Sequence, residues 1–522
     1  MRPLATGVSL TLDRRREARY TLGWQPLNRW DTMHDSSTTQ SAFGELGFKQ
    51  HISFLHREIQ DLYLEDSRPW VVGYSGGKDS TAVLQLIWQA IFELSDEQRN
   101  SKKIYVISTD TLVENPLVSR WVHRQLELMN ERAVADRMPF EAHQLYPEKK
   151  HSFWVNLIGR GYPAPWSKFR WCTERLKIWP SNKFILDTAS KYGETILALG
   201  TRKAESITRA RSMERHEKGR TRARLSRNSQ VENCLIYTPI EDWSNDDVWL
   251  FIGSTPNPWG LEHRELLSLY QDATEDRECP LITELDEKTP SCGASRFGCW
   301  TCTLVARDSS LENMVQNDLA NDWLKPLLTF RELLTVKDDK PLRDFRRMRG
   351  HVQLFHGQPI HGPFIQSYRE ELLRKLLETQ KKLQSKAPTD LKDIELISLE
   401  ELREIRRIWL TEKHEIEDRL PKIYAEVKGE AFPETGLQHY HCFGEEELAI
   451  LQDICGEDRL GYEMIREMLD VEWTLRTKLR RAGLFDNLEQ AIRRCYYENS
   501  DDAVAFVHEV DAIKRNADGA RS

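Results

Sequence analysis

The chain has 522 residues, of which 30% are charged and 39% hydrophobic, and its mean hydropathy is −0.60. At roughly 150 residues per domain, this length allows two to four domains. The composition excludes a membrane protein and a disordered chain. The 74 Lys and Arg against 82 Asp and Glu give a net charge of −8, so any affinity for nucleic acid has to come from local basic patches.

Nine cysteines occur in a chain that is too large to need disulfides for its stability. No apolar stretch approaches the roughly 18 residues of a spanning helix, and the first residues are only weakly apolar before charges resume. We therefore expect a cytoplasmic protein, with no membrane contact, whose cysteines are thiols or metal ligands.

Three regions follow one another along the chain. Residues 1–47 lack a clear period and are expected to be an N-terminal lead-in. Residues 48–310 alternate helix-like and strand-like segments, which predicts an α/β fold with a parallel sheet and helices on both faces. Residues 311–522 are expected to form a helical C-terminal domain. The expected helices include Gln50–Leu64, Thr81–Leu94, Pro116–Val134, Tyr368–Lys386 and Leu399–His414, and the expected strands are Trp70–Tyr74, Ile104–Ser108 and Thr195–Leu199.

The strongest local signal is the sequence YSGGKDST at residues 74–81, between an expected strand and an expected helix. Paired glycines let the backbone approach a phosphate, and the helix N-terminus carries partial positive charge. The segment differs from the usual P-loop because Asp79 stands where the magnesium-binding Ser or Thr should be. It is therefore predicted to be an anion cradle of another type.

The pattern Ser-Gly-Gly-x-Asp-Ser resembles the pyrophosphate (PP) loop of the adenine nucleotide alpha-hydrolase superfamily, whose members cleave ATP between the alpha and beta phosphates. The resemblance implies ATP and magnesium as ligands, with Lys78 and Asp79 taking part in catalysis. The residues expected to hold the phosphates are Ser75, Gly76, Gly77, Lys78, Asp79, Ser80 and Thr81.

Two further strand ends fit this fold. Asp110 follows the strand Ile104–Ser108, where the superfamily contacts the adenosine, at the carboxyl edge of a parallel sheet. Gly200 and Arg202 belong to a segment that resembles the Gly-x-Arg-x-x-Glu-Ser element of the sulfonucleotide reductases, and the planar fork of Arg202 suits phosphate oxygens. The competing interpretations are an ordinary strand-end turn for Asp110 and a surface arginine for Arg202.

Four cysteines lie within 24 residues, which indicates a metal site in a cytosolic chain. Zinc and an iron-sulfur cluster both accept four thiolates. A single Cys-x-x-Cys pair after two widely spaced cysteines favours a four-iron four-sulfur cluster over a zinc ribbon, although zinc stays open. The expected ligands are Cys279, Cys292, Cys299 and Cys302.

Cys172 stands apart, at the start of an expected helix and among four basic residues, Lys168, Arg170, Arg175 and Lys177. Cations and a helix N-terminus both lower the pKa of a thiol. We expect Cys172 to be a catalytic thiolate or to carry a persulfide. The alternatives are a buried small residue or a cluster ligand in place of Cys279.

Together these motifs resemble the DndC family, the sulfurtransferases of bacterial DNA phosphorothioation, which are related to phosphoadenylylsulfate reductase. The resemblance is strong over residues 48–310. It implies ATP cleavage to AMP and pyrophosphate to activate a DNA phosphate, of which one non-bridging oxygen is replaced by sulfur. It also implies a cysteine desulfurase as sulfur donor and other subunits of the phosphorothioation complex as partners.

Two basic segments are candidates for contact with DNA. Residues 202–230 carry ten basic and three acidic side chains, a net +7, and are expected to be an insertion that orders on DNA. The alternative is a solvated insertion over the active site. The segment Arg343–Arg349 mixes cations with an aromatic ring and suits DNA or a helix surface against a partner subunit.

Two other functions compete with this hypothesis. A sulfonucleotide reductase would need a catalytic Glu-Cys-Gly segment near its C-terminus, and neither Cys455 nor Cys495 reproduces it. A non-enzymatic, nucleotide-gated subunit for DNA binding or assembly would use the cluster only as a structural support.

Overall fold

The computed structural model describes residues 41–205, 207, 210–211, 213–214, 224–273, 297–433, 445–476 and 481–519. Its main sheet has six strands in the order β3-β2-β1-β4-β6-β5. The strands are β1 (Trp70–Gly73), β2 (Ile104–Thr109), β3 (Phe140–Leu145), β4 (Thr195–Ala198), β5 (Leu225–Arg227) and β6 (Cys234–Tyr237).

Four of the five strand pairings are parallel, and β5 pairs with β6 in the antiparallel direction at the sheet edge. The predicted α/β fold with a parallel sheet is thereby confirmed. Val72 in the centre of the sheet lies opposite Val106 of β2 and Ala198 of β4. From β1 the chain first builds outward to β2 and β3, and it then returns to place β4 on the other side. The carboxyl ends of β1 and β4 therefore form the switch point at which α/β proteins bind ligands.

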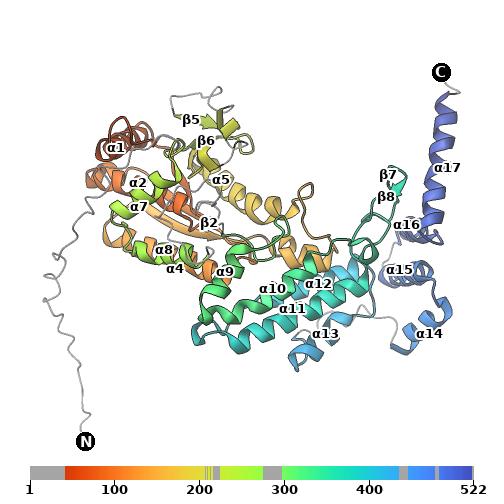
Figure 1. Cartoon of the computed structure of the whole chain (residues 1–522). Coiled ribbons are helices and arrows are strands. Elements are labelled where there is room, and N and C mark those ends of the chain that lie inside the picture. Colours follow the sequence, from red (N-terminus) through yellow and green to blue (C-terminus); the bar gives the residue numbers. More distant parts are fainter. Residues whose placement is uncertain are drawn as a thin grey trace, which may run out of the picture. The chain divides into compact units, whose positions relative to one another are not determined.

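Helices cover both faces of the sheet, as Figure 1 shows. Trp70 and Val72 point to one face and share a core with α8 and four other helices, whereas Val71 and Ile107 point to the other face and pack with α5. This alternation is the two-residue period of a strand buried on both sides. The helices of the first face are α1 (Phe48–Leu64), α2 (Lys78–Phe92), α4 (Pro116–Ala135) and α7 (Asn245–Ser254), and α5 spans Trp179–Tyr192; the short α3 (Asp96–Arg99) and α8 (His263–Asp272) complete this part.

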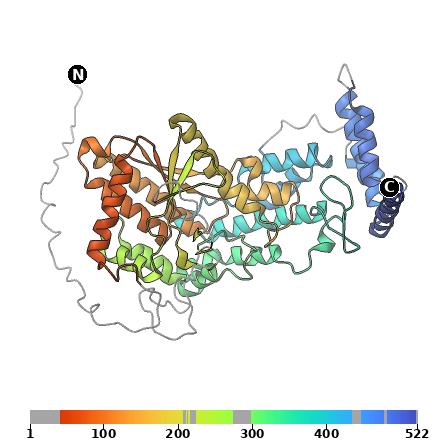
Figure 2. The ribbon, with the colours of Figure 1, turned by 90° about the horizontal axis from the view of Figure 1, so that it is seen from above.

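A group of helices follows the sheet domain. They are α9 (Ser309–Asn317), α10 (Lys325–Leu334), α11 (Gln366–Lys386), α12 (Leu399–Thr411) and α13 (Arg419–Lys428), and the expected charged helices correspond to α11 and α12. In the two views of Figures 1 and 2, α10 and α11 lie side by side. The short strands β7 (Leu354–Phe355) and β8 (Gln358–Pro359) form a separate pair.

These helices share one hydrophobic core with the segment that follows β3. Trp154 donates its indole N–H to the carbonyl of Leu396 at 2.6 Å, and Trp409 of α12 donates to the carbonyl of Ile158 at 3.0 Å. Residues Val155–Gly159 form a π-helical turn against α12. The helical region is therefore packed into the sheet domain through buried indole hydrogen bonds as well as apolar contact.

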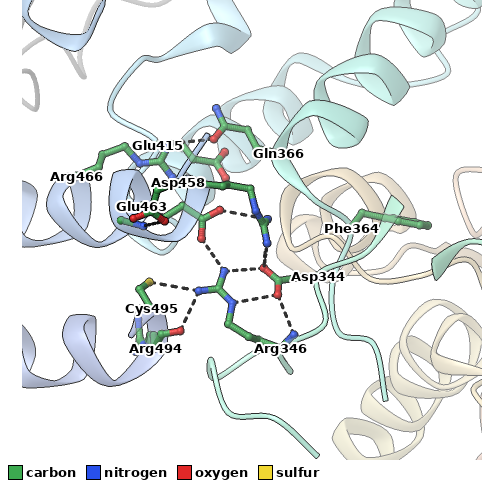
Figure 3. A network of polar contacts seen from close by, with 12 residues as sticks. Asp344, Arg346, Phe364, Gln366, Glu415, Asp458, Glu463, Arg466, Arg494 and Cys495 are labelled. Atoms are coloured by element: carbon green, nitrogen blue, oxygen red, sulfur yellow. Dashed lines mark hydrogen bonds and ion pairs between the residues drawn. The ribbon is translucent and has the colours of Figure 1, made fainter. Parts of the chain in front are cut away.

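The last helices are α14 (Glu445–Cys455), α15 (Arg459–Arg476), α16 (Leu484–Cys495) and α17 (Ser500–Gly519). Figure 3 shows how a polar network joins α15 and α16 to the loop that contains Asp344 and Arg346. Arg346 donates to Asp344 and to Glu463 of α15, both at 2.6 Å, and to the sulfur of Cys495 at 3.2 Å. The segment Arg343–Arg349 is thus a loop, and Arg346 is buried within the protein, whereas an exposed basic surface was expected.

None of the helices in the described ranges combines the length and the apolar character that a bilayer crossing requires.

Candidate functional site

A cavity of about 670 Å³ opens at the carboxyl edge of the sheet, at the switch point between β1 and β4. The ends of β1, β2 and β4 and one side of α5 line it. Of the ten residues expected to bind the nucleotide, the structure places five in its wall and five behind it. The five in the wall are Ser75, Asp79, Ser80, Asp110 and Gly200, and the five that line no described part of it are Gly76, Gly77, Lys78, Thr81 and Arg202.

The loop between β1 and α2 is held by its own serines. Ser80 Oγ accepts a hydrogen bond from the backbone N–H of Ser75 at 3.1 Å and donates to the carbonyl of Gly77 at 3.0 Å. Gly76 has a φ of +75°, and a Cβ there would lie 2.5 Å from a methyl carbon of Val122, so only glycine fits. The loop thereby brings the positively polarised N-terminus of α2 to the cavity, as an anion site requires.

Lys78 is buried beneath this loop, with its Nζ 3.2 Å from Oδ2 of Asp79 and 5.8 Å from the ring centre of Tyr270. Its backbone N–H donates to the hydroxyl of Tyr270 at 3.1 Å. Burial raises the pKa of Tyr270 well above its ordinary value, so this hydroxyl stays protonated. The charged partner of Lys78 in the described structure is thus the carboxylate of Asp79.

Arg202 approaches the same carboxylate from the loop after β4. Its Nε donates to Oδ1 of Asp79 at 2.7 Å, and Nη1 donates to the carbonyl of Trp243 at 3.1 Å. Arg202 is only 4% exposed. A Cβ on Gly200 would lie 2.8 Å from the backbone of Asp79, so the two loops touch at that position. The expected contact between Arg202 and phosphate stays a prediction, and the contact described is with Asp79.

Asp110 is fixed at the end of β2 by three donors. Its Oδ1 accepts the N–H of Leu112 at 2.8 Å, and its Oδ2 accepts from Ser119 at 2.7 Å and from Gln144 at 3.3 Å. Ser119 and Gln144 were not among the expected site residues, although both line the cavity. Gln144 lies near the end of β3 and would have been predictable only if β3 had been expected, because parallel strands end at one sheet edge.

The thiol pair of the Cys-x-x-Cys motif lies beside the cavity. Cys299 forms an isolated bridge with Glu114, and its Sγ lies 3.2 Å from the hydroxyl oxygen of Thr111. The N–H of Cys302 donates to the carbonyl of Cys299 at 2.9 Å, which closes a tight turn. Arg331 of α10 donates to the carbonyl of Cys302 at 2.8 Å and so fixes the turn from the helical region.

Burial controls the acidity of these thiols. It raises the pKa of Cys299 to about 12, against the opposing charge of Lys177. Burial also raises the pKa of Cys172, and the nearby thiol of Cys302 adds to this effect. The expectation that cations around Cys172 lower its pKa is therefore wrong, because Cys172 packs against the core shared with the helical region.

An ion pair connects the thiols to the cavity. Lys177 Nζ lies 3.3 Å from Glu114 Oε1, and both residues line the cavity. The charges of Glu114, Cys299 and Cys172 outweigh the effect of burial and raise the pKa of Lys177. A ligand bound in the cavity and a sulfur atom carried by the thiols would thus both lie next to the Glu114–Lys177 pair.

No group of three or more His, Cys, Asp and Glu side chains within the described ranges is placed to hold a metal ion. Two of the four expected ligands, Cys279 and Cys292, lie outside those ranges. The other two, Cys299 and Cys302, offer soft thiol donors in a turn next to Cys172, and thiols are the donors of iron-sulfur clusters. The donor chemistry therefore fits the expected cluster.

The basic insertion 202–230 is described only in part. Within the described positions, Lys203 pairs with Asp242 at 2.7 Å and Arg224 with Glu58 at 2.9 Å. These two cations are thus neutralised within the protein. The remaining positions that decide whether the insertion contacts DNA lie mostly outside the described residues.

Comparison with known proteins finds similarity to a protein of known sequence and to solved structures. The chain is 29% identical over 268 residues to an uncharacterized protein of Methanocaldococcus jannaschii, an alignment that covers 51% of this chain and 42% of that protein. The chain therefore spans less than half the length of this relative.

The solved structures are more distant. A phosphoadenylyl-sulfate reductase from Candida auris in complex with phosphate has a TM-score of 0.24 and 13% identity, over 40% of this chain and 89% of that one. The U34-tRNA thiolase NcsA from Methanococcus maripaludis with its [4Fe-4S] cluster has a TM-score of 0.27 and 12% identity, over 56% of this chain and 82% of that one.

The family model of the phosphoadenosine phosphosulfate reductase domain matches residues 69–305. The match begins one residue before β1 and ends three residues after Cys302, so it includes the cavity and the thiol turn. Residues 69–305 are thus similar to the phosphoadenosine phosphosulfate reductase domain.

Proposed function

We propose that the protein is a sulfurtransferase of the DndC type, which uses ATP to activate a DNA backbone phosphate and helps to replace one non-bridging oxygen with sulfur. The observation that carries this proposal is the Glu114–Lys177 pair, which lines the nucleotide-sized cavity and also contacts the surroundings of Cys299. In the proposed reaction the same DNA phosphorus is first activated by ATP and then attacked by sulfur. The nucleotide and the thiols therefore have to lie close to each other, and the Glu114–Lys177 pair contacts both places.

The loop after β1 would hold the phosphates of ATP. The positively polarised start of α2 and the hydroxyl of Ser75 at the cavity wall would bind anionic oxygens, while Ser80 supports the loop through its hydrogen bond to the carbonyl of Gly77. Lys78 and Arg202 fix the Asp79 carboxylate between them. Asp79 and Asp110 are the carboxylates in the wall that suit magnesium, whose role is to neutralise charge on the leaving pyrophosphate.

The proposed reaction has two displacements. A non-bridging oxygen of the DNA phosphate attacks the alpha phosphorus of ATP, and the bond to pyrophosphate breaks. The terminal sulfur of a persulfide on Cys172 then attacks the DNA phosphorus, and AMP leaves with the original oxygen. A thiol reductant finally cleaves the sulfur-sulfur bond, which leaves sulfur on DNA and a thiol on Cys172.

The cysteine desulfurase would supply the persulfide sulfur, and the other subunits of the phosphorothioation complex would bring the DNA. Cys299 and Cys302, with Cys279 and Cys292, would hold the four-iron four-sulfur cluster, whose chemistry is to bind or transfer sulfur and electrons. Because the pKa of Cys172 is raised, little of it is a free thiolate. Its role in sulfur transfer therefore depends on the desulfurase placing a sulfur atom on the Cys172 thiol.

The proposal is tested by incubating the purified protein with ATP, with and without DNA, and measuring AMP and pyrophosphate. We expect both products, and more of them with DNA. In cells, Lys78→Ala and Cys172→Ser should abolish phosphorothioate in nuclease-digested DNA, whereas Lys103→Ala, an exposed lysine before β2, should not. Phosphorothioate that persists in both variants would instead support a non-enzymatic assembly subunit.

A sulfonucleotide reductase is the second candidate, because the matched family model is that of the reductase domain. Its C-terminal catalytic cysteine has no counterpart at the cavity. Cys495 is buried beside Arg346, and burial raises its pKa to about 11, while Cys455 lies in α14. Neither lines the described cavity. Sulfite release from phosphoadenylylsulfate with thioredoxin would establish this alternative.

A further inference from the structure

The surface around Cys172 has a charge opposite to that of the whole protein. Residues 146–183 carry eight basic and two acidic side chains, a net +6 in a chain of net −8. The basic residues are Lys149, Lys150, Arg160, Lys168, Arg170, Arg175, Lys177 and Lys183. This basic surface is separate from the insertion 202–230, and the structure describes all of it.

Two exposed cations on this surface have no ion pair among the described residues. They are Lys168 and Arg170, which lie a few residues before Cys172. By contrast, Lys150 and Lys183 share Glu148 at 3.0 and 3.3 Å. Because no carboxylate of the described residues neutralises Lys168 and Arg170, their charge is available to attract an anionic ligand.

Three large aromatic rings are exposed on the same surface. Tyr146 is 49%, Trp166 40% and Trp179 39% exposed. The ring of Trp179 is held by the edge of His151 at 4.9 Å and by the guanidinium of Arg175 at 5.2 Å. Contacts of this kind fix the ring in place and leave part of it in solvent.

The surface leads into the cavity. Lys177, Ile178, Ser181 and Asn182, all within it, line the cavity wall on the side of α5. Cys172 lies five residues before Lys177 in the same helical segment. A ligand bound on this surface would therefore reach both the cavity and the thiols.

We propose that the surface of residues 146–183 binds an unpaired stretch of a nucleic-acid strand and presents its phosphodiester to Cys172. Lys168 and Arg170 contact phosphates, and the rings of Trp166 and Trp179 stack on bases. Bases in a duplex are already stacked on one another, so exposed rings beside exposed cations select an unpaired strand. The reason why a phosphodiester should reach Cys172 rests on the proposed function.

The test measures binding of the full chain to a fluorescent strand of about 20 nucleotides, as single-stranded DNA, as RNA and as a DNA duplex, at about 50 to 200 mM salt. We expect the wild type to bind a single strand about tenfold more tightly than the duplex. The DNA and RNA arms decide which strand is the ligand.

Charge and stacking are separated by two double variants. Lys168→Glu with Arg170→Glu should weaken binding at least about tenfold and lower the slope of log affinity against log salt by about 2. Trp166→Ala with Trp179→Ala should weaken single-strand binding about tenfold and leave the salt slope unchanged. Thermal unfolding of each variant checks that it folds.

Matched controls lie at the amino edge of the sheet. Lys103→Glu with Lys191→Glu reverses two exposed lysines, and Phe92→Ala removes a ring that is 52% exposed at the end of α2. These variants should bind as the wild type does. Equal affinity for duplex and single strand, or equal losses in the controls, would overturn the inference.

The two proposals fail separately. A protein that cleaves ATP and modifies DNA, but binds strands normally after the tryptophan and charge changes, would retain the proposed function and refute the strand-binding surface. A protein that binds single strands through this surface but transfers no sulfur would refute the proposed function and retain the surface.

Discussion

Arg202 and Asp79 form an ion pair between Nε and Oδ1 at 2.7 Å, and this pair joins the loop after β4 to the loop after β1. The arginine side chain is 4% exposed and the carboxylate 25%. Because Lys78 holds the other carboxylate oxygen, Asp79 is fixed from two sides. The two loops that meet at the switch point of the sheet are thus positioned by charge as well as by backbone contact.

Arg202→Met should weaken both the fold and the site. It leaves Asp79 with one cation, and breaking a buried pair by removing one partner costs about 3 kcal/mol. Lys203→Met removes a more exposed pair with Asp242 and should cost about 0 to 1 kcal/mol. Urea unfolding measures both, and ATP binding should fall about tenfold only for Arg202→Met. Equal unfolding free energies for the two variants would contradict this role of Arg202.

Gly200→Ala should damage the cavity without removing any polar group. The new Cβ would lie 2.8 Å from the backbone of Asp79, and backbone cannot move aside as a side chain can, so we expect a loss of about 1 to 3 kcal/mol. Gly253→Ala is the control, because the new Cβ would meet open space in α7. This substitution should raise the free energy of unfolding by about 0.5 to 1 kcal/mol. Denaturant unfolding gives both values, and ATP affinity should fall only at position 200.

Cys299→Ser should remove iron from protein purified without oxygen, because the site loses a thiol donor. Cys455→Ser, in α14, should keep the full iron and sulfide content. Cys172→Ser distinguishes the two roles considered for Cys172. If Cys172 carries sulfur, the variant protein should keep its iron and transfer no sulfur. If Cys172 is a cluster ligand, the variant protein should lose iron. Zinc in place of iron in the wild type would contradict the cluster.

The pH dependence of stability should contain a contribution from Asp344. Burial alone would raise the pKa of this carboxyl, but the hydrogen bonds and charge of Arg346, with the charge of Arg459, hold it below its ordinary value of 3.8. Because the folded pKa is depressed, the stabilisation is present above the unfolded pKa and disappears as the pH falls through the folded pKa.

Asp344→Asn should therefore be less stable than the wild type at neutral pH, and the difference should shrink below about pH 4. Urea unfolding across this range measures it. Asp393→Asn, an exposed carboxylate before α12, is the control and should show little difference at either pH. A gap of constant size from neutral to acid would mean that the Asp344 charge contributes nothing.

Local patterns were enough to predict the elements around the cavity. Residues 70–81 combine an apolar strand, paired glycines and a helix start in twelve residues, so the fold of this segment was predictable. The strand β3 was not predicted because its sequence FEAHQL is only partly apolar, although the alternation of Phe140 and Ala142 with polar residues carried the signal.

Tertiary contacts explain the remaining differences. Arg202 and Asp79 are 123 residues apart in sequence, so the approach of their loops is not visible locally. Cys172 does have basic neighbours, but its acidity follows from burial against helices more than 100 residues further on. Arg346 looked like a surface cation for the same reason, because its partners Glu463 and Cys495 come from α15 and α16.

The similarity to the reductase domain ends at residue 305, but the core does not. Trp154 and Ile158 lie before that boundary and depend on Leu396 and Trp409 after it. A protein cut at residue 305 would expose this apolar face to water and would also lose Arg331, which fixes the carbonyl of Cys302. The part of the chain that resembles the reductase domain is therefore smaller than the part needed for a closed core, and the additional helices support the turn that carries its thiols.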